Sequence, residues 1–321
     1  MAAQDEGKNG IPLDHFYVTP RHGSSSLRRI LKNFHFGAYT GYGRTYFSNK
    51  LDGFGIYQVQ NGAPALFTTT PATLYTNWVN NAGVNTTSPA GSIVANPGDP
   101  NLGFKGHAFN IPLAGTIHYE YKRYRVGGGY SYEMMSIGAL HSNVMSDKIS
   151  DMKPVSSTGF VRKYWGMLGV SFYRWNEYLL TADAQVGSFK LKTNYNSGQV
   201  KPGTYFNLGV TAERDLSEYL KVFARPAYEI KSYDLNVSGS GKSIHYNINA
   251  LYLTVGFTYS IPELPRCFLK DCHAQINHAH GNKEYRSRRH AIWKKQNPGY
   301  GENDPTLIKY KGKNKKKINP Y

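Results

Sequence analysis

The chain has 321 residues, of which 40% are hydrophobic and 14% aromatic, and this composition is too apolar for a disordered protein. Its apolar runs are far shorter than the ~20 residues of a membrane-spanning helix, so helical membrane spans are excluded. The 33 Gly and 26 Tyr, against only six Met, indicate a protein built of strands.

The net charge of +17 is unevenly distributed along the chain. Residues 263–321 contain 14 Lys or Arg and five Asp or Glu, so this segment holds about half of the excess positive charge. The chain opens with Met1-Ala2-Ala3-Gln4 and no apolar segment, so the sequence as it stands has no signal peptide. Two interpretations remain open: a cytosolic protein, or a numbering that starts at or near a processed end.

After residues 1–32, segments of about ten residues with period-two alternation recur along the chain, which is typical of transmembrane β-barrels. Each has the ~9 to 11 residues that a tilted strand needs to cross a bilayer. The sequence therefore predicts an all-β fold: an eight-stranded antiparallel transmembrane β-barrel over residues 33–262, followed by a basic, largely irregular C-terminal extension over 263–321. The eight predicted strands are 34–47, 108–121, 125–140, 161–174, 178–191, 205–214, 219–236 and 244–261.

The predicted connections alternate between long and short. Residues 48–107, 141–160, 192–204 and 237–243 form the longer connections, whereas those at 122–124, 175–177 and 215–218 are tight. Outer-membrane barrels have short periplasmic turns and longer outside loops. We therefore expect a protein of the cell outer membrane with both termini in the periplasm, and an outer loop, 48–107, that could bind surface partners or fold over the barrel mouth. The alternative is a soluble β-sandwich.

Alternation assigns the faces of the strands. Leu180, Ala182, Ala184 and Val186 share one parity and are expected to face lipid, as are Phe206, Leu208, Val210 and Ala212 in a later strand. Many Gly, including Gly43 and Gly209, fall on the polar parity, where they would make room for larger interior side chains. Pro112 and Pro226 lie inside predicted strands, and each predicts a bulge or a strand end. Aromatic residues at strand ends suit interfacial girdles; they are Phe34, Phe36, Tyr119, Tyr121, Tyr173, Trp175, Tyr219, Phe257 and Tyr259.

Charged residues on the polar parity predict an ion-pair network in the lumen, because an unpaired buried ion costs several kcal/mol. Such a network would plug the barrel. The alternative is a gated pore or a proton path, although eight strands leave an interior just wide enough for side chains. The candidates for this network are His118, Glu120, Glu133, Asp183, Glu213, Lys221, Arg225 and Glu229.

Some small barrels are lipid-modifying enzymes that need a Ser activated by a His. The candidates here are His141 and Ser142. Adjacent residues point to opposite faces of a strand, so this pair would cooperate only in an irregular segment. We therefore predict no catalytic residue, no cofactor and no small-molecule substrate.

The only two cysteines, Cys267 and Cys272, are followed by His273, His278 and His280. These residues allow three interpretations: a small disulfide loop, which a periplasmic location favours, free thiols, or soft metal ligands. Their spacing is not a standard zinc pattern, so the disulfide is the prediction.

The basic tail carries recurring aromatic residues, which add binding surface that a purely charged tail lacks. Basic runs of this kind are most often solvated and disordered. The functional interpretation is an extended segment that folds onto an acidic periplasmic or envelope-complex protein. A periplasmic location removes nucleic acid as a partner, although the composition would suit it. The residues expected to bind the partner are Tyr285, Arg286, Arg288, Arg289, Trp293, Lys294, Lys295, Tyr310, Lys315, Lys316 and Lys317.

The segments from Phe34 to Gly43 and from Leu253 to Tyr259 resemble the first and last strands of small outer-membrane barrels of the OmpA and OmpX type, especially those of Bacteroidota. The basic tail resembles that of PorG-like barrels, which dock periplasmic parts of the type IX secretion and gliding apparatus. The resemblance implies a non-enzymatic barrel that anchors a partner. The alternatives are a lipid-modifying barrel enzyme and a soluble β-rich protein with a nucleic-acid-binding tail.

Overall fold

The computed structural model describes residues 25–60, 62–69, 72–75, 82–83, 93–99, 101–152, 158–175, 178–192, 198–217, 219–237, 240–269, 278–280 and 283–286. The chain divides into two compact units. One consists of residues 34–215 and 221–259, and the other of residues 1–33, 216–220 and 260–321. The first unit contains the barrel.

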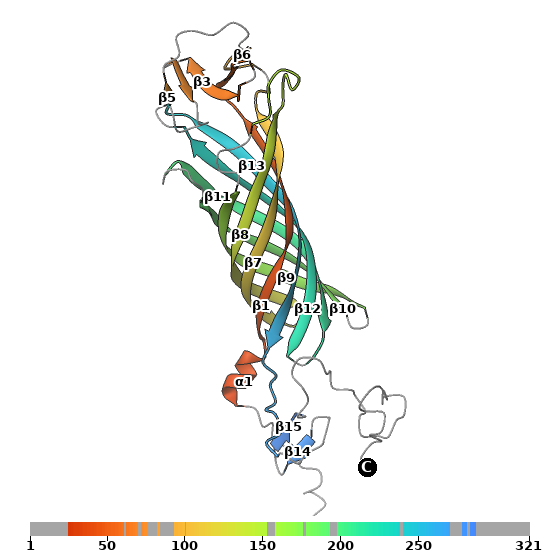
Figure 1. Cartoon of the computed structure of the whole chain (residues 1–321). Coiled ribbons are helices and arrows are strands. Elements are labelled where there is room, and N and C mark those ends of the chain that lie inside the picture. The colour runs from red at the N-terminus through yellow and green to blue at the C-terminus, as the bar shows by residue number, and fades with distance from the viewer. Residues whose placement is uncertain are drawn as a thin grey trace, which may run out of the picture. The chain divides into compact units, whose positions relative to one another are not determined.

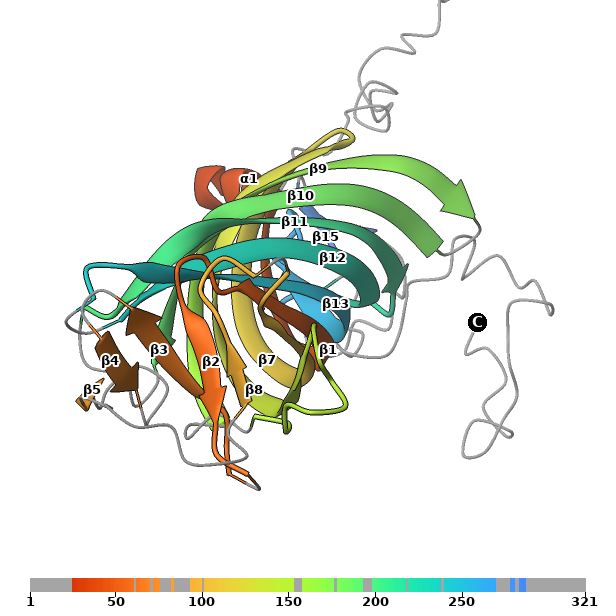
Figure 2. The ribbon, with the colours of Figure 1, turned by 90° about the horizontal axis from the view of Figure 1, so that it is seen from above.

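Eight antiparallel strands close into a barrel, which confirms the predicted fold class (Figures 1 and 2). Around the barrel the strands follow one another in chain order, and β1 closes the ring by pairing with both β7 and β13. We call the end with the tight connections the turn end and the opposite end the loop end. The strands are β1 (Phe34–Lys50), β7 (Phe104–Tyr121), β8 (Tyr124–Ser142), β9 (Thr158–Trp175), β10 (Tyr178–Lys192), β11 (Val200–Asp215), β12 (Leu220–Asn236) and β13 (Ser243–Ser260).

The strands are longer than expected at the loop end. β8 has 19 residues and β10 has 15, whereas a bilayer needs only about 9 to 11. β1 runs to Lys50 and β7 begins at Phe104, so both enter the predicted loop 48–107. Each barrel strand therefore has a part that exceeds what a membrane span requires.

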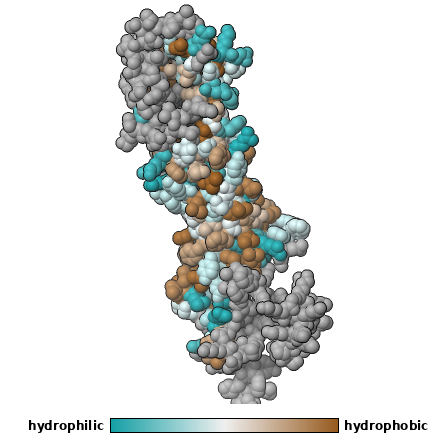
Figure 3. Space-filling model, viewed as in Figure 1, coloured by the Kyte–Doolittle hydropathy of each residue, from teal (hydrophilic) through white to brown (hydrophobic). Residues whose placement is uncertain are grey.

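The outer face of the barrel carries an apolar belt that covers only the part of each strand nearer the turn end. On β13, every second residue from Leu251 to Tyr259 is a large apolar or aromatic side chain with an exposed fraction of 41% or more. Towards the loop end, the same face of β13 presents His245 and Asn247. The outward face of β7 has exposed apolar side chains from Phe109 to Ile117, and Figure 3 shows apolar residues gathered on the lower part of the barrel. A bilayer covers an exposed apolar band of this kind on the outside of a membrane barrel.

Among the residues that the structure describes, no helix is both long enough and apolar enough to cross a membrane.

The polarity of the barrel interior changes in the opposite direction along the same strands, from apolar at the loop end to polar at the turn end. Towards the loop end, the inward residues of β13 are Ile244, Tyr246 and Ile248, which pack with Phe104 and Phe189 in one buried apolar cluster. At the level of the outer apolar belt, the interior is polar and charged. The loop-end part is thus built like a water-soluble protein and the turn-end part like a membrane barrel.

Residues 48–107 contain a small antiparallel sheet of order β5-β4-β3-β2-β6. Leu51, Phe54, Ile56 and Leu66 from this region belong to the same buried cluster as the barrel strands. The sheet therefore packs on the apolar interior of the loop end. Its strands are β2 (Gly55–Gln58), β3 (Ala65–Thr69), β4 (Ala72–Tyr75), β5 (Ala82–Gly83) and β6 (Ile93–Ala95).

A second long connection packs against this sheet. The Gln58 side chain accepts a hydrogen bond from the backbone N–H of Ser150 at 2.8 Å and donates one to its hydroxyl at 2.9 Å. The two long loop-end connections thus support each other.

The prediction of a bulge or strand end at each proline is wrong. β7 runs through Pro112, and its pairing with β1 omits Ile111 and Pro112 but keeps the same register on both sides of the gap. β12 likewise runs through Pro226, where the pairing with β11 omits two residue pairs. Each proline lacks a donor, and the ladder accommodates this by losing pairs without inserting a residue.

Interior glycines make room for large side chains, as the parity predicted. A Cβ at Gly43 would lie 2.4 Å from the Tyr252 ring, and one at Gly209 would lie 2.5 Å from Cζ of Arg225. Both distances are too short for real atoms, so alanine at either position would force the Tyr252 ring or the Arg225 guanidinium to move.

Candidate functional site

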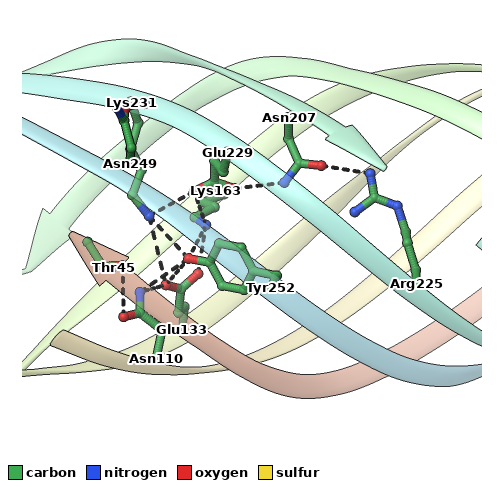
Figure 4. Close-up of polar contacts among 10 residues, drawn as sticks. All are labelled: Thr45, Asn110, Glu133, Lys163, Asn207, Arg225, Glu229, Lys231, Asn249 and Tyr252. Atoms are coloured by element: carbon green, nitrogen blue, oxygen red, sulfur yellow. Dashed lines mark hydrogen bonds and ion pairs between the residues drawn. The ribbon is translucent and has the colours of Figure 1, made fainter. Parts of the chain in front are cut away.

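A cluster of two carboxylates and two ammonium groups lies in the barrel interior at the level of the apolar belt (Figure 4). Nζ of Lys163 lies 2.7 Å from Glu133 and 2.7 Å from Glu229. Nζ of Lys231 lies 2.7 Å from Glu229 and 4.0 Å from Glu133. The hydroxyl of Tyr252 donates to Glu133 at 2.6 Å and accepts from both lysines at 3.2 Å. We call these five residues the central cluster.

Asparagine side chains extend the central cluster. Asn110 donates to Glu133 and accepts from the Thr45 hydroxyl. Asn207 donates to Glu229 at 3.2 Å, while its amide oxygen accepts from Arg225 at 2.7 Å. Asn207 therefore links the central cluster to the next ion pair in the interior.

That next pair is Asp183 on β10 with Arg225 on β12. Nη2 and Nε of Arg225 lie 2.5 and 2.8 Å from Oδ1 of Asp183. The Thr211 hydroxyl donates to the other carboxylate oxygen at 2.8 Å. Nε of Arg225 also lies 3.1 Å from Oδ2 of Asp183. The guanidinium thus contacts both carboxylate oxygens, which is among the stronger charge-assisted arrangements.

A third group of charges lies nearest the turn end. The Arg125 guanidinium donates to both oxygens of Glu213, at 2.6 and 2.5 Å, and its Nε lies 2.7 Å from Glu120. Glu120 also lies 3.2 Å from Nε2 of His35 and 3.6 Å from Nζ of Lys221. This group thus joins residues from five barrel strands, β1, β7, β8, β11 and β12.

The interior charges balance. Five carboxylates in the three groups, Glu120, Glu133, Asp183, Glu213 and Glu229, face five cations, Arg125, Lys163, Lys221, Arg225 and Lys231. The central charged side chains are almost completely buried, with exposed fractions of 0% for Glu133 and 1% for Lys231. Because an eight-stranded barrel is just wide enough for side chains, this network fills the lumen as a neutral plug.

His35, His118 and Glu120 are the described residues that could together ligate a metal ion, since their ligand atoms lie within 4.8 Å of one another. The two imidazoles are stacked, and Nε2 of His118 lies 3.3 Å from Glu120. Arg125 and Lys221 already neutralise the Glu120 carboxylate. A divalent cation there would be repelled by both, so we assign these residues to the ion-pair network.

The structure places every predicted lumen residue in one of these groups. Sequence reasoning missed the cations Lys163, Lys231 and Arg125, and the hydroxyl of Tyr252. The sequence pattern could have identified them. Lys231 lies two residues after Glu229 and Arg125 two residues before Gly127, so each shares the inward parity of that neighbour. Extending the parity count to every strand would have found them.

The structure does not join His141 to Ser142. Nδ1 of His141 lies 2.6 Å from Asp151, whereas the Ser142 hydroxyl donates to the Val144 carbonyl at 2.6 Å. His141 is exposed and Ser142 is buried. His141 is therefore not placed to activate Ser142 as a nucleophile.

The second unit holds the start of the C-terminal segment together with the connection between β11 and β12. The Arg286 guanidinium lies 4.3 Å from the centre of the Tyr219 ring, and its Nε donates to the Leu264 carbonyl at 3.1 Å. Its backbone N–H donates to Pro265, and its carbonyl accepts from Cys267. With an exposed fraction of 5%, Arg286 holds this segment together and contributes little free surface.

The same unit contains α1 (Ser26–Leu31), which begins at the N-cap Ser25. Nζ of Lys32 lies 2.7 Å from Glu263, and Arg28 donates to the Pro262 carbonyl at 3.4 Å. The segment before β1 and the segment after β13 are thus held to each other.

A short hairpin of β14 (His278–His280) and β15 (Lys283–Tyr285) interrupts the segment that was expected to be irregular. Sγ of Cys267 lies 3.3 Å from Nε2 of His280, and the His280 ring contacts Tyr285. Cys272 and His273 lie outside the described residues, so the predicted disulfide between Cys267 and Cys272 stays a prediction. The predicted tail residues that also lie outside them are Arg288, Arg289, Trp293, Lys294, Lys295, Tyr310, Lys315, Lys316 and Lys317.

No protein-family model matches the chain, and no curated protein matches its sequence. Among solved structures, it is similar to the outer membrane protein OprG from Pseudomonas aeruginosa, with 9% identity and a TM-score of 0.38 over 72% of this chain and 97% of that one. It is also similar to the outer membrane protease OmpT from Escherichia coli, with 12% identity and a TM-score of 0.33 over 72% of this chain and 97% of that one. The translocator domain of the autotransporter NalP from Neisseria meningitidis gives 13% identity and a TM-score of 0.24 over 71% of this chain and 88% of that one. Likenesses this distant carry no conclusion about activity.

Proposed function

We propose that this chain is a non-enzymatic outer-membrane barrel with periplasmic termini, which anchors a periplasmic or envelope-complex protein through its C-terminal segment. The observation that carries the proposal is the neutral, buried ion-pair plug inside a barrel with an apolar outer belt. A plugged barrel offers no path for solutes. What it supplies is a fixed position in a membrane.

The organisation of the second unit supports recruitment by the tail. Arg286 and Tyr219 connect the start of the C-terminal segment to the β11–β12 connection. The remaining residues, 287–321, contain ten Lys or Arg and two Asp or Glu. A basic segment that begins from a fixed point suits capture of an acidic partner.

The periplasmic location of the termini rests on loop lengths. The connections at the turn end are short and those at the loop end are long, which is the arrangement of outer-membrane barrels. Type IX secretion or gliding machinery in Bacteroidota is the setting that the tail resemblance suggests, and it belongs to this proposal alone.

Fractionation and protease access test the location. We expect the full chain in outer-membrane fractions, with a tail that a protease removes only after the outer membrane has been permeabilised. Cleavage of the tail in intact cells would place the termini outside and overturn the proposed orientation.

Truncation tests the recruitment. Removing residues 287–321 leaves Arg286 and its contacts in place, so the barrel should still insert while a specific partner no longer co-purifies. Replacing Lys315, Lys316 and Lys317 by Gln should weaken the same co-purification. The matched control replaces three exposed loop-end cations, Lys105, Lys190 and Lys192, by Gln. Unchanged recovery of the partner after truncation would contradict the proposal.

A further inference from the structure

An apolar groove of about 860 Å³ crosses the outer face of the barrel, within the range of about 300 to 1,000 Å³ that is usual for ligand sites. Its floor is on β10, where Ala184 pairs with Leu168 of β9 on one side and Leu208 of β11 on the other. The exposed fractions of these two leucines are 64% and 50%. Small side chains between large ones therefore make a trough on the lipid-facing surface.

The neighbouring outward row repeats this pattern. Ala182 lies between Val170 and Val210, and these three strands lie side by side in Figure 2. The groove also reaches Tyr124 at the start of β8, close to the turn end. Its lining residues come from six neighbouring strands, β8 to β13, and its surface is mostly apolar, as a hydrocarbon chain requires.

A second hollow, of about 360 Å³, lies at the turn-end rim between the β7–β8 turn and the start of the β9–β10 hairpin. We call it the rim notch. Exposed Phe172 and Tyr173 line it together with Tyr124, and such aromatic side chains are typical of the headgroup level of a membrane. The rim notch also contains five cations and one carboxylate: Lys122, Arg123, Arg125, Arg174, Lys221 and Glu120.

Most of this positive charge is uncompensated. Arg125 and Lys221 lie 2.7 and 3.6 Å from Glu120. Lys122, Arg123 and Arg174 make no ion pair with any residue that the structure describes. Three cations at the headgroup level attract an anion, and each contributes to its affinity.

Tyr124, with an exposed fraction of 62%, lines both the groove and the rim notch, so the two hollows meet at this residue. Arg125 also lines both, but its side chain points inwards to Glu120 and Glu213. We propose that together the groove and the rim notch form a binding site for one phospholipid with an anionic headgroup. Its phosphate lies in the rim notch near Lys122, Arg123 and Arg174, and an acyl chain lies in the groove over Ala182 and Ala184. A free phosphate would use the notch but leave the groove without a role, and a lipid uses both. The site does not involve the C-terminal segment, so it can fail or succeed independently of partner recruitment.

The test is native mass spectrometry of the full chain, titrated with phosphatidylglycerol and with phosphatidylcholine of identical acyl chains. The expected result is at least about tenfold tighter binding of phosphatidylglycerol, since cations near a membrane surface contribute additively. Replacing Lys122, Arg123 and Arg174 by Gln should abolish the preference. The control is the triple Gln variant of Lys105, Lys190 and Lys192, which makes the same charge change at the loop end and should keep the preference.

The groove needs a variant of its own. Ala184→Trp fills the floor of the groove and should weaken binding of both lipids, whereas Leu113→Trp on the outward face of β7 should not. Heat-modifiable gel migration checks that each variant folds, and Arg174→Gln alone, with a partial loss of preference, serves if the triple variant does not fold. Equal affinity for the two lipids, or a preference that survives the notch variant, would overturn the proposal. A third pair of results would also overturn it. If inorganic phosphate displaced phosphatidylglycerol and Ala184→Trp had no effect on binding, the notch would be a site for a free anion.

Discussion

The plug can be tested by removing one interior charge without changing the shape of the side chain. Glu229 lies 2.7 Å from both Lys163 and Lys231, and its own exposed fraction is 2%. Glu229→Gln leaves two buried ammonium groups with one remaining carboxylate, that of Glu133. The substitution should therefore create an uncompensated positive charge in the barrel interior.

Removing one partner of a buried ion pair costs about 3 to 5 kcal/mol of unfolding free energy. The matched control lies on the same strand: Asp234 lies 2.7 Å from His245, with side-chain exposed fractions of 46% and 54%. Because exposed pairs contribute about 0 to 1 kcal/mol, Asp234→Asn should cost little. The expected difference between the two variants is thus about 2 to 5 kcal/mol.

Urea unfolding of the folded chain in lipid vesicles measures this difference. The double variant Glu229→Gln with Lys231→Met restores charge balance and should recover a large part of the loss. If Glu229→Gln costs no more than Asp234→Asn, the interior charges are solvated and the plug does not exist as described.

Three further outcomes are expected. Gly209→Ala should lower the unfolding free energy by about 1 to 3 kcal/mol by displacing Arg225, whereas Gly115→Ala, with no atom within 4 Å of the added Cβ, should be nearly neutral. In planar lipid bilayers the purified chain should give no stable conductance, since its interior charges are paired and buried; discrete conductance steps would contradict a closed lumen. Arg286→Ala should speed proteolytic removal of the C-terminal segment at unchanged barrel stability, whereas replacing the exposed Lys283 by Ala should not; equal cleavage of both variants would show that the stacked arginine does not hold the segment.

The barrel could be predicted because strand parity is a local property. Alternation from Phe206 to Ala212 already separates a lipid face from a lumen face, and the structure buries Asn207 while exposing Leu208. Towards the loop end the apolar side chains face inwards and the polar ones outwards, and this reversal was harder to predict. Ile244 and Tyr246 keep the inward parity, but only the closed barrel shows that they meet the sheet of residues 55–95.

The interior network was predictable in kind but not in its connections. Parity places Glu133 and Glu229 in the lumen, yet it does not say which cation each one meets, because that depends on the positions of strands across the barrel. Lys163 contacts both carboxylates from β9. The two prolines show a similar limit, since a closed ladder can omit pairs without shifting register.

The most direct test of a membrane barrel with a filled, charged interior is fluorescence quenching of single-tryptophan variants in vesicles of brominated phospholipids. Trp165 faces the interior with an exposed fraction of 6%, whereas Leu168, three residues later on β9, faces outwards at 64%. Brominated acyl chains should strongly quench a tryptophan placed at position 168 and leave Trp165 almost unaffected. Equal quenching at the two positions, or quenching at neither, would contradict the account.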